Sequence, residues 1–180
     1  MSYMSKFSED SLIEDIFASD LDRYAPIALL AENLLRGPSK LSIAERELMA
    51  AYVSGLNQCS YCFGSHVEIA SAFGIDEAVI KAMIDDLATA DLAPRMVPLY
   101  QFIRKLTLEP AKLHGGDAEA VYQAGLDEQT LSDAVAICSL FSFANRIAMG
   151  HGLKHHSGTR LKSVIEAIVQ KGYMPENILA

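Results

Sequence analysis

Two thiols, an imidazole and a carboxylate lie close together in this 180-residue chain, in the pattern E-x11-C-x2-C-x3-H. The four residues are Glu47, Cys59, Cys62 and His66. If residues 59–66 are helical, both cysteines and the histidine fall at positions i, i+3 and i+7 and share one face. Two adjacent thiols with a proton acceptor beside them are the minimum needed to form and break a disulfide. The spacing therefore indicates thiol redox chemistry.

The four residues also suggest a division of roles. A thiolate, not a thiol, attacks a peroxide or a disulfide, and a helix N-terminus or a nearby histidine favours the thiolate. Cys62 and His66 are i, i+4 neighbours, so the imidazole can accept the thiol proton directly or through water. Glu47 comes from the preceding predicted helix and can orient that imidazole. Cys59 lies one turn from Cys62, close enough to close a disulfide with it.

A structural zinc site is the main alternative for the same residues. Cys59, Cys62 and His66 would supply three ligands, and a fourth would come from one of three later histidines, His151, His155 or His156. A purely structural role for the pair is the remaining possibility. A thioredoxin-like module would need strands around its C-x2-C, and a haem c attachment would need a histidine directly after the second cysteine. The sequence favours redox chemistry over both metal binding and a structural role.

Two further polar residues follow the most apolar stretch of the chain, 134–144. They are Asn145 and Arg146, and we expect them to satisfy buried carboxylates or to contact another subunit, and less often to contact substrate. The third cysteine, Cys138, lies within that stretch and fits core packing, because free cysteines are commonly buried.

Composition narrows the possible partners and location. The net charge of −8 and pI near 5.0 argue against nucleic-acid binding, which needs a basic face. A hydrophobic content of 51% is high for a small monomer and predicts an apolar face buried between subunits. The apolar stretch is about half the length needed to span a bilayer, so we expect no membrane span. With no signal-like segment at the start and a C-x2-C typical of reducing compartments, a cytoplasmic protein is expected.

The periodicity of apolar residues predicts an all-α fold. Expected helices are a first one around residues 12–17 and others over 22–36, 42–56, 59–73, 75–87, 97–108, 119–124, 131–149 and 161–171. We expect one domain over residues 1–180, with an N-terminal half of about 1–92 that carries the C-x2-C and a C-terminal half of about 95–180. The segment 93–95 fits a linker. Similarity between residues 72–77 and 123–128 hints at an internal pseudo-repeat of helical halves.

Beyond the motif itself, several strings of the sequence resemble one known group, the AhpD-like alkylhydroperoxidases of the carboxymuconolactone decarboxylase superfamily, in their uncharacterised peroxidase-related branch. The resemblance covers about residues 25–152 and is carried by Leu34-Leu35-Arg36-Gly37-Pro38-Ser39, Ala44-Glu45-Arg46-Glu47-Leu48, Val53-Ser54-Gly55-Leu56-Asn57, Cys59-x-Tyr61-Cys62-x3-His66 and Phe143-Ala144-Asn145-Arg146.

The resemblance implies an all-α, AhpD-like helical fold assembled as trimers or hexamers. It implies Cys62 as the peroxidatic nucleophile, Cys59 as the resolving thiol, His66 as the base and Glu47 as its partner. The decarboxylase branch of the superfamily lacks the cysteine pair, so the C-x2-C argues against lactone decarboxylation. Well-characterised AhpD enzymes carry a histidine immediately before the second cysteine. Tyr61 stands there in this chain, and a tyrosine is a poor base at neutral pH.

Together these patterns predict a thiol-dependent peroxidase that reduces hydrogen peroxide or organic hydroperoxides through a C-x2-C disulfide cycle. Cys62, Cys59, His66 and Glu47 are the expected catalytic residues, with Tyr61, Asn145 and Arg146 as auxiliary candidates. The cycle needs no bound cofactor or metal, but it needs an external thiol or dithiol reductant. The alternatives are a redox-sensing or zinc-holding module, a disulfide reductase, or a decarboxylase-like lyase.

Overall fold

The computed structural model describes residues 2–178, and the regular elements in that range are all helical. This confirms the all-α prediction. The α-helices are α1 (Ile13–Ala18), α2 (Leu21–Arg36), α3 (Ile43–Leu56), α4 (Ser60–Ala72), α5 (Glu77–Asp85), α6 (Val97–Leu108), α7 (Gly115–Gln123), α8 (Glu128–Gly150), α9 (Thr159–Lys171) and α10 (Pro175–Ile178). Short 3-10 turns cover Leu87–Thr89, Pro94–Met96 and Pro110–Lys112.

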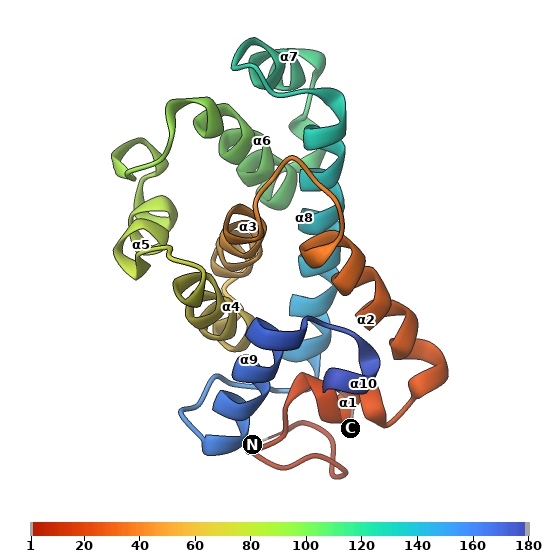
Figure 1. Cartoon of the computed structure of the whole chain (residues 1–180). Coiled ribbons are helices and arrows are strands. Elements are labelled where there is room, and N and C mark those ends of the chain that lie inside the picture. The colour runs from red at the N-terminus through yellow and green to blue at the C-terminus, as the bar shows by residue number, and fades with distance from the viewer. Residues whose placement is uncertain (1, 179–180) are drawn as a thin grey trace.

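Helix α3 lies at the centre of the bundle and packs against α4 and α8, with α2, α5 and α6 around it (Figure 1). Every residue from Arg46 to Ser54 is buried. A helix that is apolar on all sides belongs in the core of a bundle and not on its surface. The same burial takes Glu47 out of water, so its carboxylate must find partners inside the protein.

Helix α8 is long and apolar enough to cross a membrane by length and composition alone. In this structure 44% of its most apolar window is buried inside the protein. Its contacts with α3, α6, α2 and α4 make it a core helix of this bundle. It also buries Asn145 completely and hydrogen-bonds that side chain to α3. The prediction of a buried helix over residues 134–144 is thus confirmed.

The turn between α2 and α3 is held by a buried arginine. Nη1 of Arg46 donates to the carbonyl oxygens of Leu34 (3.0 Å) and Gly37 (2.8 Å), which are left without partners at the end of α2. Ser42 begins α3 with the capping box that its sequence predicts, because its hydroxyl accepts from the Glu45 N–H. This turn brings the last residue of α2 next to the centre of α3.

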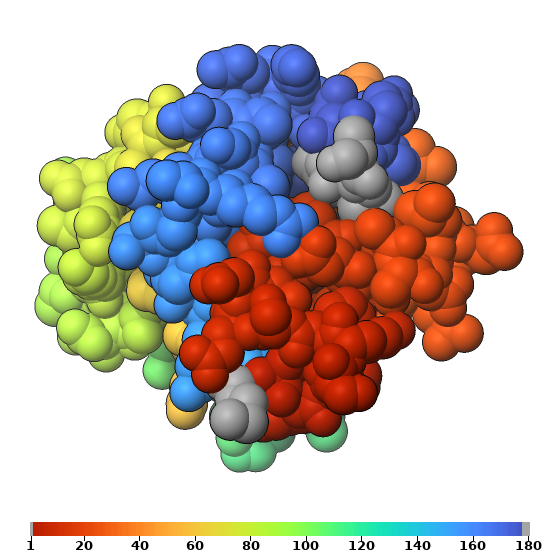
Figure 2. All heavy atoms as spheres, turned by 90° about the horizontal axis from the view of Figure 1, so that it is seen from below, coloured from red at the N-terminus to blue at the C-terminus, as the bar shows by residue number. Residues whose placement is uncertain are grey.

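The N-terminal segment and the C-terminal helices lie side by side on one face of the molecule (Figure 2). Arg160 of α9 makes two hydrogen bonds of 2.6 Å to the Asp15 carboxylate of α1. Nearby, the Ser2 hydroxyl donates to the His151 carbonyl. Helices α1 and α9, whose Asp15 and Arg160 are 145 positions apart in sequence, therefore close one side of the bundle together.

Some predicted boundaries differ from the structure. The segment 109–117, expected as a loop, contains a 3-10 turn and the start of α7 at Gly115, four residues before the expected position. Asp117 explains the early start, because its carboxylate accepts from the His114 N–H and binds Lys105 of α6. Helix α5 is shorter than the predicted 75–87, because Asp86 ends it and opens a 3-10 turn.

Candidate active site

The cysteine pair lies at the N-terminus of α4, because the chain breaks just before it. Gln58 has a φ of 58°, a left-handed conformation that ends the preceding helical path. Cys59 then takes the N-cap position of α4 with extended backbone, and Cys62 lies in the first turn. The expected helix break before Cys59 is confirmed. Both cysteines are free and almost wholly buried, with 1% and 4% of their surface exposed.

The two thiols ionise as a coupled pair. The Cys59 sulfur accepts hydrogen bonds from the Cys62 thiol and from the backbone N–H groups of Cys62 and Tyr61, which lower the pKa of Cys59 to about 7 against the opposing effect of burial. The same thiol–thiol hydrogen bond raises the pKa of Cys62, as do its burial and the charge on Cys59. One proton is thus shared between the sulfurs, and the helix N-terminus favours leaving the negative charge on Cys59.

Asn145 reaches this pair from α8. Its side-chain amide donates to the Ser54 hydroxyl (3.0 Å), and its carbonyl accepts from the Asn57 amide (2.9 Å). It also hydrogen-bonds the Cys62 sulfur, a contact that favours the Cys62 thiolate. Asn145 therefore meets α3 and a thiol, and not the buried carboxylate that its sequence position led us to expect. Arg146 is not brought to the thiols, and its Nη1 donates to the Ser142 carbonyl of its own helix.

Glu47 and His66 meet as their spacing predicts. Nδ1 of His66 lies 2.8 Å from Oε2 of Glu47, and the carboxylate has no exposed surface. Burial opposes ionisation of Glu47, but the hydrogen bond and charge of His66 and the charge of Arg36 outweigh it and hold the Glu47 pKa below its ordinary value. With Nδ1 engaged, Nε2 is the ring nitrogen left for chemistry. The ring itself packs edge-on against Phe141 at 4.5 Å between centroids.

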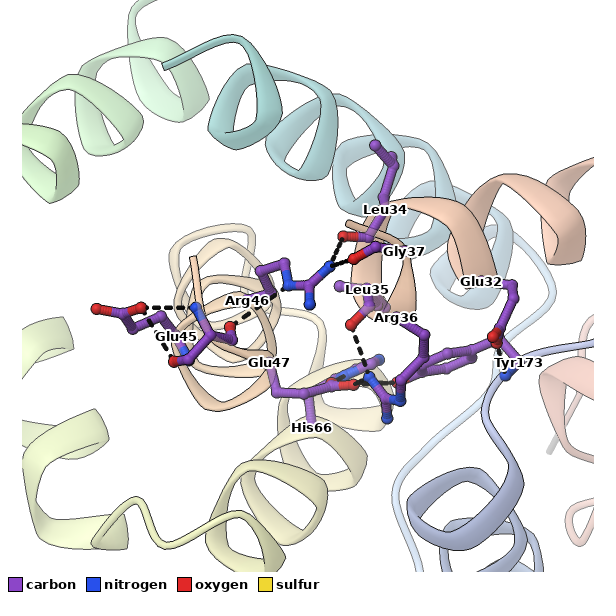
Figure 3. A network of polar contacts seen from close by, with 11 residues as sticks. Glu32, Leu34, Leu35, Arg36, Gly37, Glu45, Arg46, Glu47, His66 and Tyr173 are labelled. Atoms are coloured by element: carbon purple, nitrogen blue, oxygen red, sulfur yellow. Dashed lines mark hydrogen bonds and ion pairs between the residues drawn. The ribbon is translucent and has the colours of Figure 1, made fainter. Parts of the chain in front are cut away.

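Two residues that the sequence did not single out as functional complete the Glu47 site (Figure 3). Arg36, the last residue of α2, places Nη1 2.5 Å from Oε1 of Glu47. The Tyr173 hydroxyl lies 2.9 Å from Oε1 and 3.1 Å from Oε2 of the same carboxylate. The Arg36 guanidinium also stacks between the rings of Phe73 and Tyr173. The sequence did not identify Arg36 as a site residue, because a cation at a helix end usually hydrogen-bonds the last carbonyls or interacts with the helix dipole.

Gly172 turns the chain so that Tyr173 can point inward. It ends α9 with a φ of 78°, a conformation that glycine adopts without strain. The turn also places the Tyr173 N–H 2.5 Å from the Glu32 carboxylate of α2. A glycine after an amphipathic helix is the sequence signal for this turn, but the signal does not say what the next side chain will contact.

Cys62 and His66 line one cavity of about 90 Å³, which five helices enclose. Its walls are mostly aliphatic and aromatic, and the lining residues are Ile13, Glu14, Phe17, Ile27, Ala28, Ala31, Tyr61, Cys62, Ser65, His66, Ile69, Leu140, Phe141, Ala144, Leu161, Val164, Ile165, Ile168 and Tyr173. Cys59 is not among them. The negative charge is therefore favoured on Cys59, whereas the cysteine that lines the cavity is Cys62.

Tyr61 connects the thiol helix to α1. Its hydroxyl accepts from the Ile13 N–H at 3.0 Å and donates to Oε2 of Glu14 at 3.4 Å. Burial raises the Tyr61 pKa well above its ordinary value, as does the neighbouring Glu14 charge, so the phenol stays protonated. Tyr61 thus acts as a hydrogen-bonding wall of the cavity and not as a base.

Within residues 2–178, no group of three or more histidine, cysteine, aspartate or glutamate side chains is arranged to hold a metal ion. The three histidines considered as a fourth zinc ligand do not join Cys59, Cys62 and His66 in such a group, and Nδ1 of His156 accepts from the Gly158 N–H at 3.2 Å. Nδ1 of His151 lies 2.7 Å from the Ile147 carbonyl, and Nε2 of His155 lies 3.2 Å from Glu68. His66 gives its Nδ1 to Glu47. The donor geometry does not fit the zinc alternative.

Comparisons with known proteins agree with this architecture. The model of the carboxymuconolactone decarboxylase family matches residues 24–104, which include the whole E-x11-C-x2-C-x3-H motif. No curated protein matches the chain significantly. The uncharacterized peroxidase-related protein from Silicibacter sp. TM1040 has a TM-score of 0.75 and 23% identity, over 81% of this chain and 76% of that one.

Two other solved structures share the fold. An uncharacterized peroxidase-related protein from Ralstonia eutropha JMP134, described as an alkylhydroperoxidase AhpD core, has a TM-score of 0.73 and 24% identity, over 79% of this chain and 75% of that one. A protein of unknown function from Agrobacterium tumefaciens has a TM-score of 0.66 and 16% identity, over 80% of this chain and 97% of that one. The chain has the AhpD-like fold, and its residues 24–104 match the carboxymuconolactone decarboxylase family, in agreement with the resemblance seen in its sequence motifs.

Proposed function

We propose that this protein is a thiol peroxidase that reduces hydroperoxides through a Cys59–Cys62 disulfide cycle. The observation that carries the proposal is the joint position of Cys62 and His66 in the wall of one cavity, with Cys59 hydrogen-bonded to Cys62 behind that wall. A peroxide bound in the cavity would contact Cys62, and the Cys59 sulfur lies next to Cys62 for disulfide formation. The peroxidase-related structures of the same fold support this reading.

The chemistry follows from the cavity wall that Cys62 and His66 share and from the hydrogen bond between the two thiols. The proton of Cys62 moves to His66 or is exchanged with Cys59, and the resulting Cys62 thiolate attacks the outer peroxide oxygen. An S–O bond forms and the O–O bond breaks, so Cys62 becomes a sulfenic acid and the other peroxide oxygen leaves as an alkoxide or hydroxide that takes up a proton to give the alcohol or water. Cys59 then attacks the Cys62 sulfur, which closes the disulfide and releases water. Its low pKa suits Cys59 to this second step, because the thiolate is the attacking form.

Glu47 serves this cycle through His66 and does not touch the substrate. Its carboxylate fixes the imidazole with Nδ1 engaged and stabilises the charged ring after proton uptake. Arg36 and Tyr173 hold Glu47 ionised and in place within the core. The proton path therefore depends on residues from α2, α3, α4 and the segment after α9.

An external thiol or dithiol must reduce the disulfide to complete turnover, and a cytoplasmic location would supply such a reductant. We also propose a homo-oligomer, a trimer or hexamer. Exposed leucines on α2, Leu29 and Leu30, and exposed Phe143 on the neighbouring α8 support an apolar contact between copies. Light scattering after size-exclusion chromatography tests the assembly, and a monomeric mass at micromolar protein would contradict it.

The experiment that tests the function is thiol counting with peptide mapping on reduced protein, before and after one equivalent of cumene hydroperoxide. Rapid loss of two thiols into a Cys59–Cys62 disulfide is expected, with Cys138 unchanged as the internal control. Cys138 is buried between α6 and α8, and burial raises its pKa. Unreactive thiols at positions 59 and 62 would rule the peroxidase proposal out.

A further inference from the structure

Glu14 of α1 is a buried acid in the wall of the cavity that Cys62 faces. It is the one carboxylic acid among the described lining residues, in surroundings that are mostly aliphatic or aromatic. Only 8% of its surface is exposed. The sequence motif does not include it, and the proton relay through Glu47 and His66 does not use it. A buried acid beside a reactive thiol requires a physical explanation, because burial of an ionised carboxylate is costly.

Burial favours the neutral form of Glu14 and outweighs its backbone hydrogen bond, the Arg160 charge and the Tyr61 hydrogen bond, which favour the carboxylate. Its hydrogen-bonding partner is the uncharged Tyr61 phenol of α4. The cation whose charge reaches it, Arg160 of α9, gives both of its short hydrogen bonds to Asp15. Burial raises the Glu14 pKa to about 7, and the charge of Asp15 adds to the effect. The walls from α2 and α8 contribute only apolar side chains to the cavity. Glu14 can therefore carry a proton at neutral pH and release it.

We propose that Glu14 is a catalytic acid, which protonates the departing oxygen of the hydroperoxide as Cys62 attacks; this inference rests on the peroxidase function proposed above. The Cys62 thiolate forms a bond to the outer oxygen of ROOH, and the O–O bond breaks with its electron pair on RO⁻. The Glu14 carboxyl gives its proton to RO⁻, which yields ROH and the Glu14 carboxylate. Cys62 retains OH as the sulfenic acid, so atoms and charge balance. Solvent then restores the Glu14 proton.

The position of Glu14 suits this step better than that of His66. Displacement at oxygen requires the sulfur and the two peroxide oxygens to lie nearly in line, so the leaving oxygen points away from Cys62. His66 is one turn along the same helix as the nucleophile, whereas Glu14 comes from another helix that encloses the cavity. A neutral Glu14 also assists the attack, because a charge there would raise the pKa of Cys62.

The test compares two oxidants with different leaving groups, in stopped-flow single-turnover oxidation of the full-length reduced protein. tert-Butyl hydroperoxide releases a strongly basic alkoxide that needs a proton, whereas peracetic acid releases acetate, which does not. Glu14→Gln keeps the shape and the neutral state of the acid but has no proton to transfer. We expect it to slow the reaction with tert-butyl hydroperoxide by about 100-fold and to leave the reaction with peracetic acid nearly unchanged. Glu166→Gln, an exposed change on α9, is the matched control and should affect neither.

The outcomes separate this inference from the proposed function. Equal slowing with both oxidants, or no slowing with either, would overturn the role of Glu14 while leaving the peroxidase intact. Wild-type protein that reacts with neither oxidant would instead refute the peroxidase function. The wild type alone gives a second test, which does not depend on how the variant folds. After correction for ionisation of the peracid, the ratio of its rate constants for tert-butyl hydroperoxide and peracetic acid should fall as pH rises through about 7. A flat ratio would contradict the proposal. The other titratable groups around Glu14 and its cavity act on both reactions through the Cys62 thiolate; they are Tyr61, Asp15, Arg160, Cys62, His66 and Tyr173.

Discussion

The phenol of Tyr173, just beyond the end of α9, hydrogen-bonds both carboxylate oxygens of Glu47 on the central helix, 126 positions earlier in the chain. The bond is buried, and it joins the C-terminal segment to the carboxylate that orients His66. The same ring stacks on the Arg36 guanidinium, which is the cationic partner of Glu47. The last part of the chain is thus a structural component of the proposed proton relay.

Removing the Tyr173 hydroxyl should therefore weaken the fold at the site. Tyr173→Phe keeps the ring but leaves the buried Glu47 charge with one hydrogen bond fewer, and such bonds contribute roughly 1.5–3 kcal/mol. We expect a loss of that size in the free energy of unfolding, measured by urea titration at pH 7. Tyr122→Phe, at a half-exposed tyrosine of α7, is the control and should change stability by less than about 0.5 kcal/mol. Equal stability of the two variants would show that the hydroxyl does not support Glu47.

The turn at Gly172 provides a paired test of how Tyr173 is positioned. A Cβ at Gly172 would lie 2.3 Å from the Glu32 carboxylate, whereas a Cβ at Gly125 would meet nothing within 4 Å. Both glycines have positive φ, so alanine at either costs at least about 1–2 kcal/mol in backbone strain, and at Gly172 the ψ of −162° adds to this strain because it is reached almost only by glycine. Gly172→Ala should destabilise the protein more than Gly125→Ala and should also slow peroxide-dependent thiol loss. Similar effects of both substitutions on stability and rate would argue against a role for the turn in the site.

The shared proton of the two thiols predicts an unusual titration. Alkylation of reduced protein by iodoacetamide should show a first ionisation near pH 7, set by Cys59 at the N-terminus of α4. Cys59→Ser removes that low ionisation, so the remaining Cys62 should alkylate only at a higher pH, because it is buried and lacks the same backbone donors. Mass spectrometry of the labelled peptides measures both. A first ionisation that persists unchanged in Cys59→Ser would assign the low pKa to Cys62 instead.

The same Cys59→Ser variant should stop the peroxide cycle halfway. Without a resolving thiol, the sulfenic acid at Cys62 should persist long enough to be trapped by dimedone as a single adduct. Cys62→Ser should give no adduct and no turnover, because Cys59 does not line the cavity. The measurement is intact-protein mass after one equivalent of hydroperoxide. Full peroxidase activity in Cys62→Ser protein would contradict the assignment of the nucleophile.

Burial of Glu14 predicts a pH-dependent stability difference. Its pKa is about 7 in the folded protein and near 4.5 when unfolded, so the folded state binds the extra proton between these values and stability falls as pH rises through them. Glu14→Gln removes this dependence. Its free energy of unfolding, relative to wild type, should therefore increase by about 3 kcal/mol between pH 4 and pH 8. Glu166→Gln should show no such trend. A constant difference between Glu14→Gln and wild type would mean that Glu14 titrates normally.

Local sequence determined the helices and the active-site motif. Apolar periodicity and the capping box at Ser42 placed α3, and the i, i+4 spacing placed Cys62 and His66 on one face of α4. The pairing of Glu47 with His66 followed from the same pattern, because it joins two consecutive helices. The Cys62–His66 spacing follows from helix periodicity, whereas Glu47 and His66 meet because the consecutive helices α3 and α4 pack against each other.

Only the tertiary structure decided which distant residues reach the site. Arg36, Tyr173 and Glu14 lie on separate elements, and nothing in their local sequence shows that they meet Glu47 or Cys62. The tertiary structure also assigns the thiolate and the contact with the cavity to different cysteines. Backbone donors at the start of α4 favour a Cys59 thiolate, whereas Cys62 lines the cavity. The physical reason is that burial and hydrogen bonding set the ionisation of a group, and both depend on how helices far apart in the chain pack together.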